Sequence, residues 1–161
     1  MNLVILNSLE SLKEFTADTI IDVRAPAEYA DDHLPGAINL PVLDDTQRAE
    51  IGTLYKRNPF MARKKGAALV ALNAANHLQG PLAAKDGGWQ PLIYCWRGGQ
   101  RSGAFATILE QVGWRVQLLE GGYRSYRREI VKALYDRPLL HRLMLIGGST
   151  GTAKTALLHQ L

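Results

Sequence analysis

The chain contains a single cysteine, Cys95, and the residues around it favour nucleophilic chemistry. It follows an apolar run over residues 91–94 that is typical of a buried strand, and it precedes a segment over residues 102–112 with the periodicity of a helix. A loop between a strand and a helix directs backbone N–H groups at an anion, and the helix N-terminus adds partial positive charge. We therefore expect a thiol whose pKa lies below the ~8.5 of a free cysteine, so that a thiolate is available as nucleophile.

The loop after Cys95 also supplies groups that bind anions. Two arginines carry full positive charge, and a pair of glycines permits backbone angles that are closed to other residues. The bland alternative is a buried structural thiol, the common fate of a lone cysteine, but the coincidence of glycines, arginines and a strand-to-helix junction favours a reactive one. The candidate oxyanion-binding residues are Arg97, Gly98, Gly99, Gln100, Arg101 and Ser102.

Length and composition fit a globular protein of one domain, with room for a short appendage. The chain has 161 residues, 47% hydrophobic content and a net charge of +4. One cysteine excludes an intramolecular disulfide and favours a reducing compartment. The N-terminus has no basic segment of a signal peptide, and no apolar stretch approaches the ~18 residues of a membrane span. We expect a cytoplasmic protein without a membrane partner.

Basic residues gather in two stretches, over residues 48–65 and 121–144, which hold twelve of the 19 lysines and arginines. Such stretches are either solvated helix faces or a surface for a polyanion such as RNA. The candidates for contacts with the phosphates of such a polyanion, which the family resemblance given below implies to be tRNA, are Lys56, Arg57, Arg63, Lys64, Lys65, Arg124, Arg127 and Arg128.

The elements that position these residues alternate between strands and helices. The pattern predicts strands over residues 4–6, 19–23, 91–94, 115–119 and 139–146, and helices over 8–15, 48–56, 62–78, 102–112 and 123–135. Leu72 and Val112 are predicted to face the core. Alternation of this kind indicates an α/β fold with a mainly parallel central sheet flanked by helices, and ligands bind such sheets at the carboxyl ends of the strands.

Three separated motifs, in the right order, resemble rhodanese domains. They are Asp22-Val23-Arg24 with Glu28-Tyr29 and the following His33 to Pro41 segment, the Cys95 loop, and Leu119-Glu120-Gly121-Gly122-Tyr123. The resemblance covers about residues 1–135 and implies a rhodanese-like domain over residues 1–137. It also implies that Asp22 and Arg24 brace the strand ends around the loop. No His/Cys cluster has metal-ligand spacing, so we expect no metal in this part.

Other strings resemble a narrower family, the tRNA 2-selenouridine synthases. These are Gly52-Thr53-Leu54-Tyr55-Lys56, Pro59-Phe60, Gly66 to Val70, the whole string from Tyr94 to Ser102, and Gly121 to Arg124. The resemblance implies an enzyme that replaces the sulfur of wobble 2-thiouridine in tRNA by selenium, through an S-geranylated intermediate, with Cys95 essential. It implies selenophosphate and geranyl diphosphate as co-substrates and no tightly bound cofactor.

In that family a P-loop domain follows the rhodanese domain, and the end of this chain has a matching Gly-rich loop. Gly148, Gly151, Lys154 and Thr155 would bind phosphates, with Ala153 standing where the motif has glycine. The chain ends at Leu161, so residues 138–161 would form only the start of such a domain, and Mg²⁺ would bind only in a complete one.

Three alternatives remain open. Arg101 follows Cys95 by six positions, which resembles the Cys-x5-Arg loop of dual-specificity phosphatases that share the rhodanese fold. A plain sulfurtransferase would carry a persulfide on Cys95. A non-catalytic RNA-binding fragment would bind tRNA with salt-dependent affinity and no turnover.

Overall fold

The computed structural model describes residues 1–136, 138, 142 and 144–160. Its strands are β1 (Asn2–Val4), β2 (Thr19–Asp22), β3 (Ile38–Asn39), β4 (Pro91–Tyr94) and β5 (Gln117–Leu119). Its helices are the 3-10 helix η1 (Glu10–Glu14), α1 (Pro26–Asp31), α2 (Asp45–Arg57), α3 (Pro59–Gln79), α4 (Gln100–Val112), α5 (Tyr123–Tyr135) and α6 (Lys154–Leu158).

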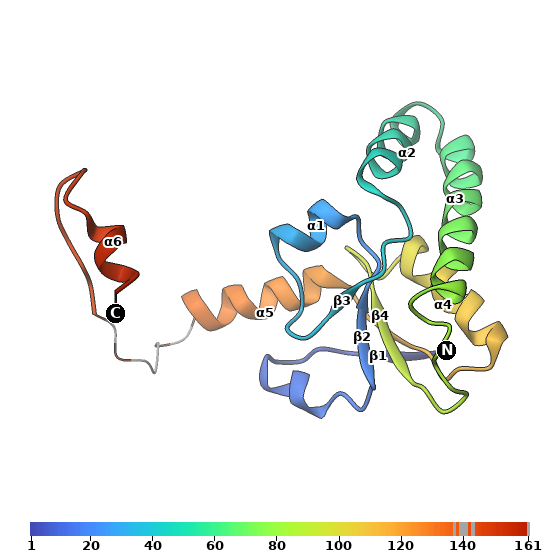
Figure 1. The fold of residues 1–161 in the computed structure, drawn as a ribbon, viewed down its shortest axis with the longest axis horizontal. Helices are drawn as coiled ribbons and strands as arrows, with labels where there is room; N and C mark the ends of the chain where they lie inside the picture. Colours follow the sequence, from blue (N-terminus) through green and yellow to red (C-terminus); the bar gives the residue numbers. More distant parts are fainter. Residues whose placement is uncertain (137, 139–141, 143, 161) are drawn as a thin grey trace.

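The five strands form one parallel sheet in the order β1-β5-β4-β2-β3, with helices on both faces (Figure 1). The predicted α/β fold with a parallel central sheet is therefore confirmed. β4 is the central strand and is buried along its whole length. Residues that follow β4 thus emerge at the middle of the carboxyl edge of the sheet, where ligands bind in parallel sheets.

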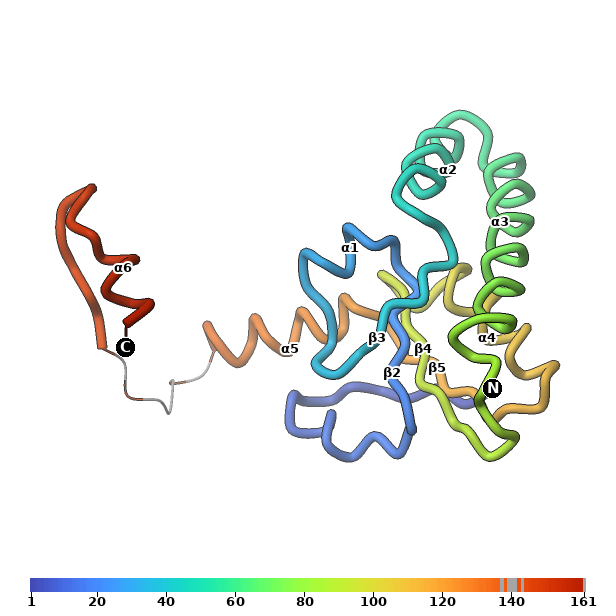
Figure 2. The backbone as a smooth tube through the Cα atoms, in the orientation of Figure 1, coloured from blue at the N-terminus to red at the C-terminus, as the bar shows by residue number. Residues whose placement is uncertain are grey.

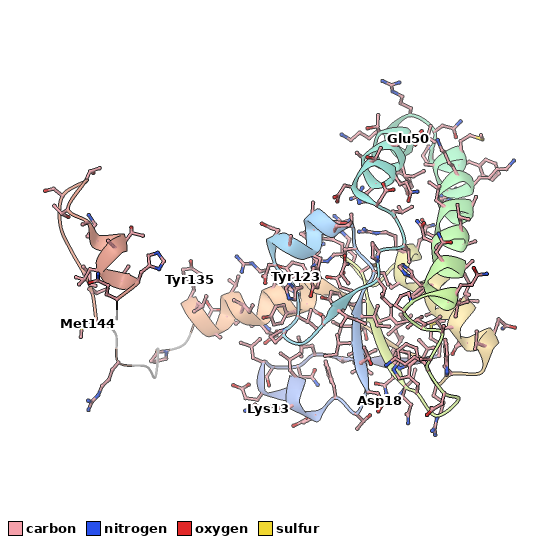
Figure 3. All side chains as sticks on the ribbon, viewed as in Figure 1. Lys13, Asp18, Glu50, Tyr123, Tyr135 and Met144 are labelled. Atoms are coloured by element: carbon pink, nitrogen blue, oxygen red, sulfur yellow. The ribbon has the colours of Figure 1, made fainter. Side chains whose placement is uncertain are left out.

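Alternate residues of the strands serve two separate cores. Ile93 and Cys95 pack on one face with Phe105 and Leu109 of α4, and Val70 and Ala74 of α3 belong to the same core. On the other face, Leu92 and Tyr94 pack with residues of α5 that include Tyr123 and Tyr126. The period of two in a strand explains the division. Figure 3 shows Tyr123 among the packed side chains, whereas Tyr135 at the far end of α5 stands in the open.

Local sequence signals explain the helix boundaries. Asp44 accepts a hydrogen bond from the backbone of Gln47 and begins α2, and Asn58 with Pro59 does the same for α3. Figure 2 shows α2 and α3 as a helical hairpin that rises beyond the carboxyl edge of the sheet. This hairpin places α2 next to the loop after β4, as the shared cavity described below shows.

Several sequence predictions need correction. Leu72 and Val112 are 58% and 52% exposed, because α3 is buried through Ala62, Val70 and Ala74, and α4 through Phe105 and Leu109. The first strand ends at Val4, since its pairing with β5 covers residues 2–4. The predicted helix over 8–15 is a short 3-10 helix. Half of the predicted strand over 139–146, positions 139–141 and 143, lies outside the described residues, and positions 142 and 144–146 have no regular structure.

Candidate active site

Cys95 directly follows β4 and is only 3% exposed. Its Sγ accepts a hydrogen bond from the backbone N–H of Gly99 at 3.3 Å and lies 3.1 Å from Oγ of Ser102. Both donors belong to the start of α4. Since Gly99 caps α4 without a side chain, the first-turn amides are directed at the sulfur and its surroundings.

These contacts change the acidity of the thiol. Burial by itself would raise the pKa of Cys95, but the hydrogen bonds from the side chain and backbone of Ser102 favour the thiolate, as does the positive charge of Arg101. The net result is a pKa below the ordinary value of a cysteine. The sulfur therefore has the electronic character of a nucleophile.

The Cys95 loop rests on the segment that joins β5 to α5. Tyr123 donates its backbone N–H to the carbonyl of Cys95 at 2.8 Å, and Arg124 donates to the carbonyl of Trp96 at 3.1 Å. Gly122 has a φ of 58°, and a Cβ there would lie 2.2 Å from the Cys95 carbonyl oxygen. Only glycine fits this close approach. The first two backbone N–H groups of α5 are thus used to hold the loop and are not free for a ligand.

Asp22 and Arg24 form a buried ion pair at the end of β2. Nη2 of Arg24 lies 2.6 Å from Oδ2 of Asp22 and also donates to the backbone carbonyl of Asp32 at 2.6 Å. The guanidinium lies 4.1 Å from the centre of the Tyr123 ring. Both side chains are fully paired within the interior, so their contacts join β2, α1 and the start of α5 beneath the loop.

Arg101 is held by an acidic partner that the sequence analysis did not assign to the site. Its Nη1 lies 2.7 Å from Oε2 of Glu28. Glu28 also accepts the backbone N–H of Ala25 at the start of α1. Burial would raise the pKa of Glu28, but the hydrogen bond and charge of Arg101 outweigh burial, so the pKa lies below its usual value. Arg101 therefore faces Cys95 with a counter-ion already in place.

A cavity of about 1250 Å³ lies between the Cys95 loop and α2. The loop contributes Cys95, Arg97, Gln100 and Arg101, and α2 contributes Arg48 and Lys56. A smaller, mainly apolar pocket of about 340 Å³ adjoins it between α2, α3 and α4 and shares Ile51 and Tyr55. The Cys95 thiol thus opens toward a basic cavity with an apolar extension.

The six predicted oxyanion-binding residues divide into two groups. Arg97, Gly99, Gln100 and Arg101 line the cavity. Ser102 is fully buried and contacts the sulfur. Gly98 has a φ of 68°, and a Cβ there would lie 2.9 Å from the carbonyl oxygen of Leu119, so the loop packs closely at this point. Oxyanion binding by these two residues stays a prediction, and the contacts observed for them are with the sulfur and with the β5–α5 segment.

The predicted tRNA contacts are all exposed and lie on three helices, α2, α3 and α5. Lys56, Arg57, Arg63, Lys64 and Lys65 occupy the end of α2 and the start of α3, where Lys56 lines the cavity and Lys65 pairs with Glu50. Arg124, Arg127 and Arg128 occupy the first turns of α5, and Arg127 lies 4.0 Å from Asp32. Exposed aromatic side chains, Tyr55 and Phe60, lie among the first group.

The second Gly-rich loop precedes α6 and folds back on itself. Nζ of Lys154 donates to the carbonyls of Gly148 and Ser149 at 2.9 and 2.7 Å. Ala153 has a φ of 55°, in the left-handed region that favours glycine. Gly151 also has a positive φ, and Thr155 lies in α6. Met144 and Leu145 are 82% and 92% exposed, so this segment is not packed on the sheet (Figure 3).

Two kinds of feature are absent from the described part of the chain. No cluster of three or more His, Cys, Asp or Glu side chains is placed to hold a metal ion. Nor does any of its helices combine the length and apolar character that crossing a membrane requires.

The parallel sheet and the loop at its carboxyl edge define an α/β domain with a cysteine of lowered pKa at the end of its central strand. The rhodanese-like domain family matches residues 6–129, and the chain belongs to this family. The structure of the N-terminal domain of a candidate ATP/GTP binding protein from Clostridium difficile 630 has a TM-score of 0.67 and 34% sequence identity. That comparison covers 81% of this chain and 99% of the other.

Curated relatives are tRNA 2-selenouridine synthases. The protein from Nitrosomonas europaea is 40% identical over 151 residues, which cover 91% of this chain and 39% of the relative. The protein from Salmonella arizonae is 41% identical over 150 residues, which cover 89% of this chain and 40% of the relative. The chain therefore spans about two fifths of the length of the curated relatives it matches.

Proposed function

We propose that this chain is the rhodanese part of a tRNA 2-selenouridine synthase, in which sulfur of wobble 2-thiouridine is replaced by selenium from selenophosphate. The observation that carries the proposal is the Cys95 thiolate at the edge of a basic cavity. The similarity to synthases from Nitrosomonas europaea and Salmonella arizonae supports it. A tRNA substrate places the reaction in the cytoplasm.

The residues around the cavity have separate roles in this proposal. Cys95 handles the selenium or the displaced thiol, while Arg97, Arg101 and the amide of Gly99 stabilise the oxyanion of selenophosphate. The basic groups on α2, α3 and α5 bind tRNA phosphates. S-geranylation of the 2-thiouridine, with geranyl diphosphate as donor, makes the sulfur a better leaving group, and the adjoining apolar pocket could hold an apolar substituent.

The Gly-rich loop over residues 147–155 is the start of a P-loop domain in this proposal. Gly148, Gly151, Lys154 and Thr155 would take part in phosphate binding once such a domain is complete, and Mg²⁺ would bind only there. Ala153 adopts the backbone conformation that the glycine of the motif would adopt without strain.

Protection of Cys95 from alkylation tests the proposal without requiring turnover. Iodoacetamide would modify Cys95 in the presence of either tRNA bearing S-geranyl-2-thiouridine or the same tRNA without the modification. We expect stronger protection by the modified tRNA, because the modified nucleoside would enter the cavity beside the sulfur. Equal protection by both tRNAs, or none by either, would contradict the proposal.

A plain sulfurtransferase is the second candidate, because a persulfide on Cys95 would receive the same hydrogen bonds as the thiolate. It predicts a Cys95-dependent transfer of sulfur from thiosulfate to cyanide that tRNA does not affect. The ion pair between Arg101 and Glu28 does not discriminate between this reaction and the phosphatase alternative.

A further inference from the structure

Arg48 on α2 has no role in the function proposed above, yet it lines the same cavity as Cys95. Its Nε is buried, and it has no hydrogen-bond partner among the described residues. Oε2 of Glu28 lies 3.6 Å from this Nε, close enough for an ion pair but beyond hydrogen-bonding distance, and the Arg48 side chain as a whole is 42% exposed. The charge of Arg48 is thus paired and partly solvated, but its buried Nε–H lacks an acceptor, and a ligand in the cavity can supply one.

Gly52, one turn after Arg48, makes room for this side chain. A Cβ at Gly52 would lie 2.9 Å from Nη1 of Arg48. Gly52 opens one of the strings noted in the sequence, and no cap or turn requires glycine in the interior of α2. The space it leaves lets Nη1 of Arg48 approach the backbone of α2 at the edge of the cavity.

Glu28 joins Arg48 to the other arginine of the site. The same carboxylate oxygen, Oε2, lies 2.7 Å from Nη1 of Arg101 and 3.6 Å from Nε of Arg48. One carboxylate therefore sits between two guanidinium groups, so the cluster retains a net positive charge. Such a cluster is suited to an oxyanion of more than one negative charge.

We propose that Arg48, positioned by Glu28 and by the space at Gly52, is a further oxyanion ligand of the Cys95 cavity. Its ligand is a phosphate-type dianion, which under the proposed function is the phosphate group of the selenium donor. Phosphodiesters of the tRNA backbone offer the same chemistry with a single charge, so a test must separate the two sources.

The test measures how small anions protect Cys95 from iodoacetamide. Inorganic phosphate represents the dianionic donor, and dimethyl phosphate represents the tRNA backbone. We expect inorganic phosphate to protect the wild-type chain. Arg48→Gln should weaken that protection about tenfold, the loss expected when one charge-assisted hydrogen bond is removed. Arg115→Gln, which removes an exposed charge away from this cavity, is the matched control and should leave the protection unchanged.

A second variant moves the guanidinium without removing its charge. Gly52→Ala favours the helix, so α2 should fold, but its Cβ displaces Nη1 of Arg48. We expect Gly52→Ala to weaken phosphate protection in the same direction as Arg48→Gln. Arg48→Lys should restore only part of it, because an ammonium group lacks the planar fork of donors.

Three results would overturn the proposal. They are wild-type protection in Arg48→Gln, absence of protection by inorganic phosphate in the wild-type chain, and a loss confined to dimethyl phosphate, which would assign Arg48 to tRNA. None of these results depends on tRNA binding or turnover, so failure here is distinguishable from failure of the proposed function.

Discussion

The sulfur of Cys95 receives hydrogen bonds from the first turn of α4, and these contacts set its reactivity. Ser102 is buried beside it, and Arg101 supplies charge while bound to Glu28. The sequence predicts a low pKa from the two arginines and the helix N-terminus. The structure assigns the largest favourable part to Ser102, which the sequence pattern placed on the oxyanion instead.

Replacement of Ser102 by alanine should raise the pKa of Cys95. The thiolate would lose a hydrogen bond while burial, which opposes the charged form, would remain. The rate of alkylation by iodoacetamide rises with pH through the pKa of the thiol, so its inflection should move to higher pH in Ser102→Ala. Thr107→Ala, which removes an exposed hydroxyl from the same helix, should leave the inflection in place. An unchanged inflection in Ser102→Ala would show that Ser102 does not stabilise the thiolate.

The pKa of Cys95 also bears on stability. Because it is lowered on folding, thiolate formation stabilises the folded state at pH values above the unfolded pKa of ~8.5. This contribution is lost as the pH falls through the folded pKa. Ser102→Ala should therefore reduce the free energy of unfolding more at alkaline than at neutral pH.

The elements that carry the site meet at one junction, where the loop after β4 lies on the turn between β5 and α5. Gly122 packs closely against the backbone of Cys95, and Gly98 packs closely against the backbone of Leu119. The first backbone N–H groups of α5 also donate hydrogen bonds to the carbonyls of Cys95 and Trp96. A substitution in the β5–α5 turn should therefore affect Cys95 although it lies 27 positions further along the chain.

Gly122→Ala tests this junction. Its Cβ would lie 2.2 Å from the Cys95 carbonyl oxygen at a φ of 58°, so we expect destabilisation by about 3 kcal/mol, from strain and from the clash. Gly36→Ala is the matched control, since Gly36 has a φ of 77° but nothing within 4 Å, and it should cost only about 1 kcal/mol. Urea unfolding gives both values. Equal losses in the two variants would mean that the close approach has no energetic consequence.

Most elements around the site could be predicted because their signals are local. The strand over 91–94 and the helix over 123–135 agree with β4 and α5, since apolar runs and glycines mark their ends. Glu28 and Arg48 were missed as site residues, because the contact between Glu28 and Arg101 joins positions 73 residues apart. The pattern of residues along the chain does not predict that α1, α2 and α4 lie next to one another in the fold. A glycine in the interior of a helix, Gly52 of α2, was the sequence feature that could have indicated a special role for Arg48.

The molecule as a whole presents two groups of exposed basic residues on helices that adjoin the Cys95 loop or its cavity. One group lies on α2 and α3 and the other on the first turns of α5, which begins on the loop backbone. This arrangement suits a polyanion that approaches the cavity from outside while the thiol stays buried. The chain spans about two fifths of the length of its curated relatives.

Binding of tRNA should therefore depend on salt. Lys64→Gln or Arg128→Gln should weaken tRNA binding and should reduce the slope of log K against log salt by about one unit per lost phosphate contact. Lys13→Gln, a charge change on η1, should leave the slope unchanged. Filter binding over a range of salt concentrations gives the slopes. If the Lys64 and Arg128 variants gave the same slope as Lys13→Gln, Lys64 and Arg128 would be excluded from the tRNA-binding surface.

Incubation of the 161-residue chain with selenophosphate and tRNA bearing S-geranyl-2-thiouridine tests the central claim most directly. The nucleosides would be identified by mass spectrometry, with Cys95→Ala as the control. The account predicts 2-selenouridine in the wild-type reaction and none in Cys95→Ala. Formation of 2-selenouridine by both proteins would show that Cys95 does not carry the chemistry. Its absence from both, with tRNA still bound, would contradict the assignment of selenium transfer to this domain.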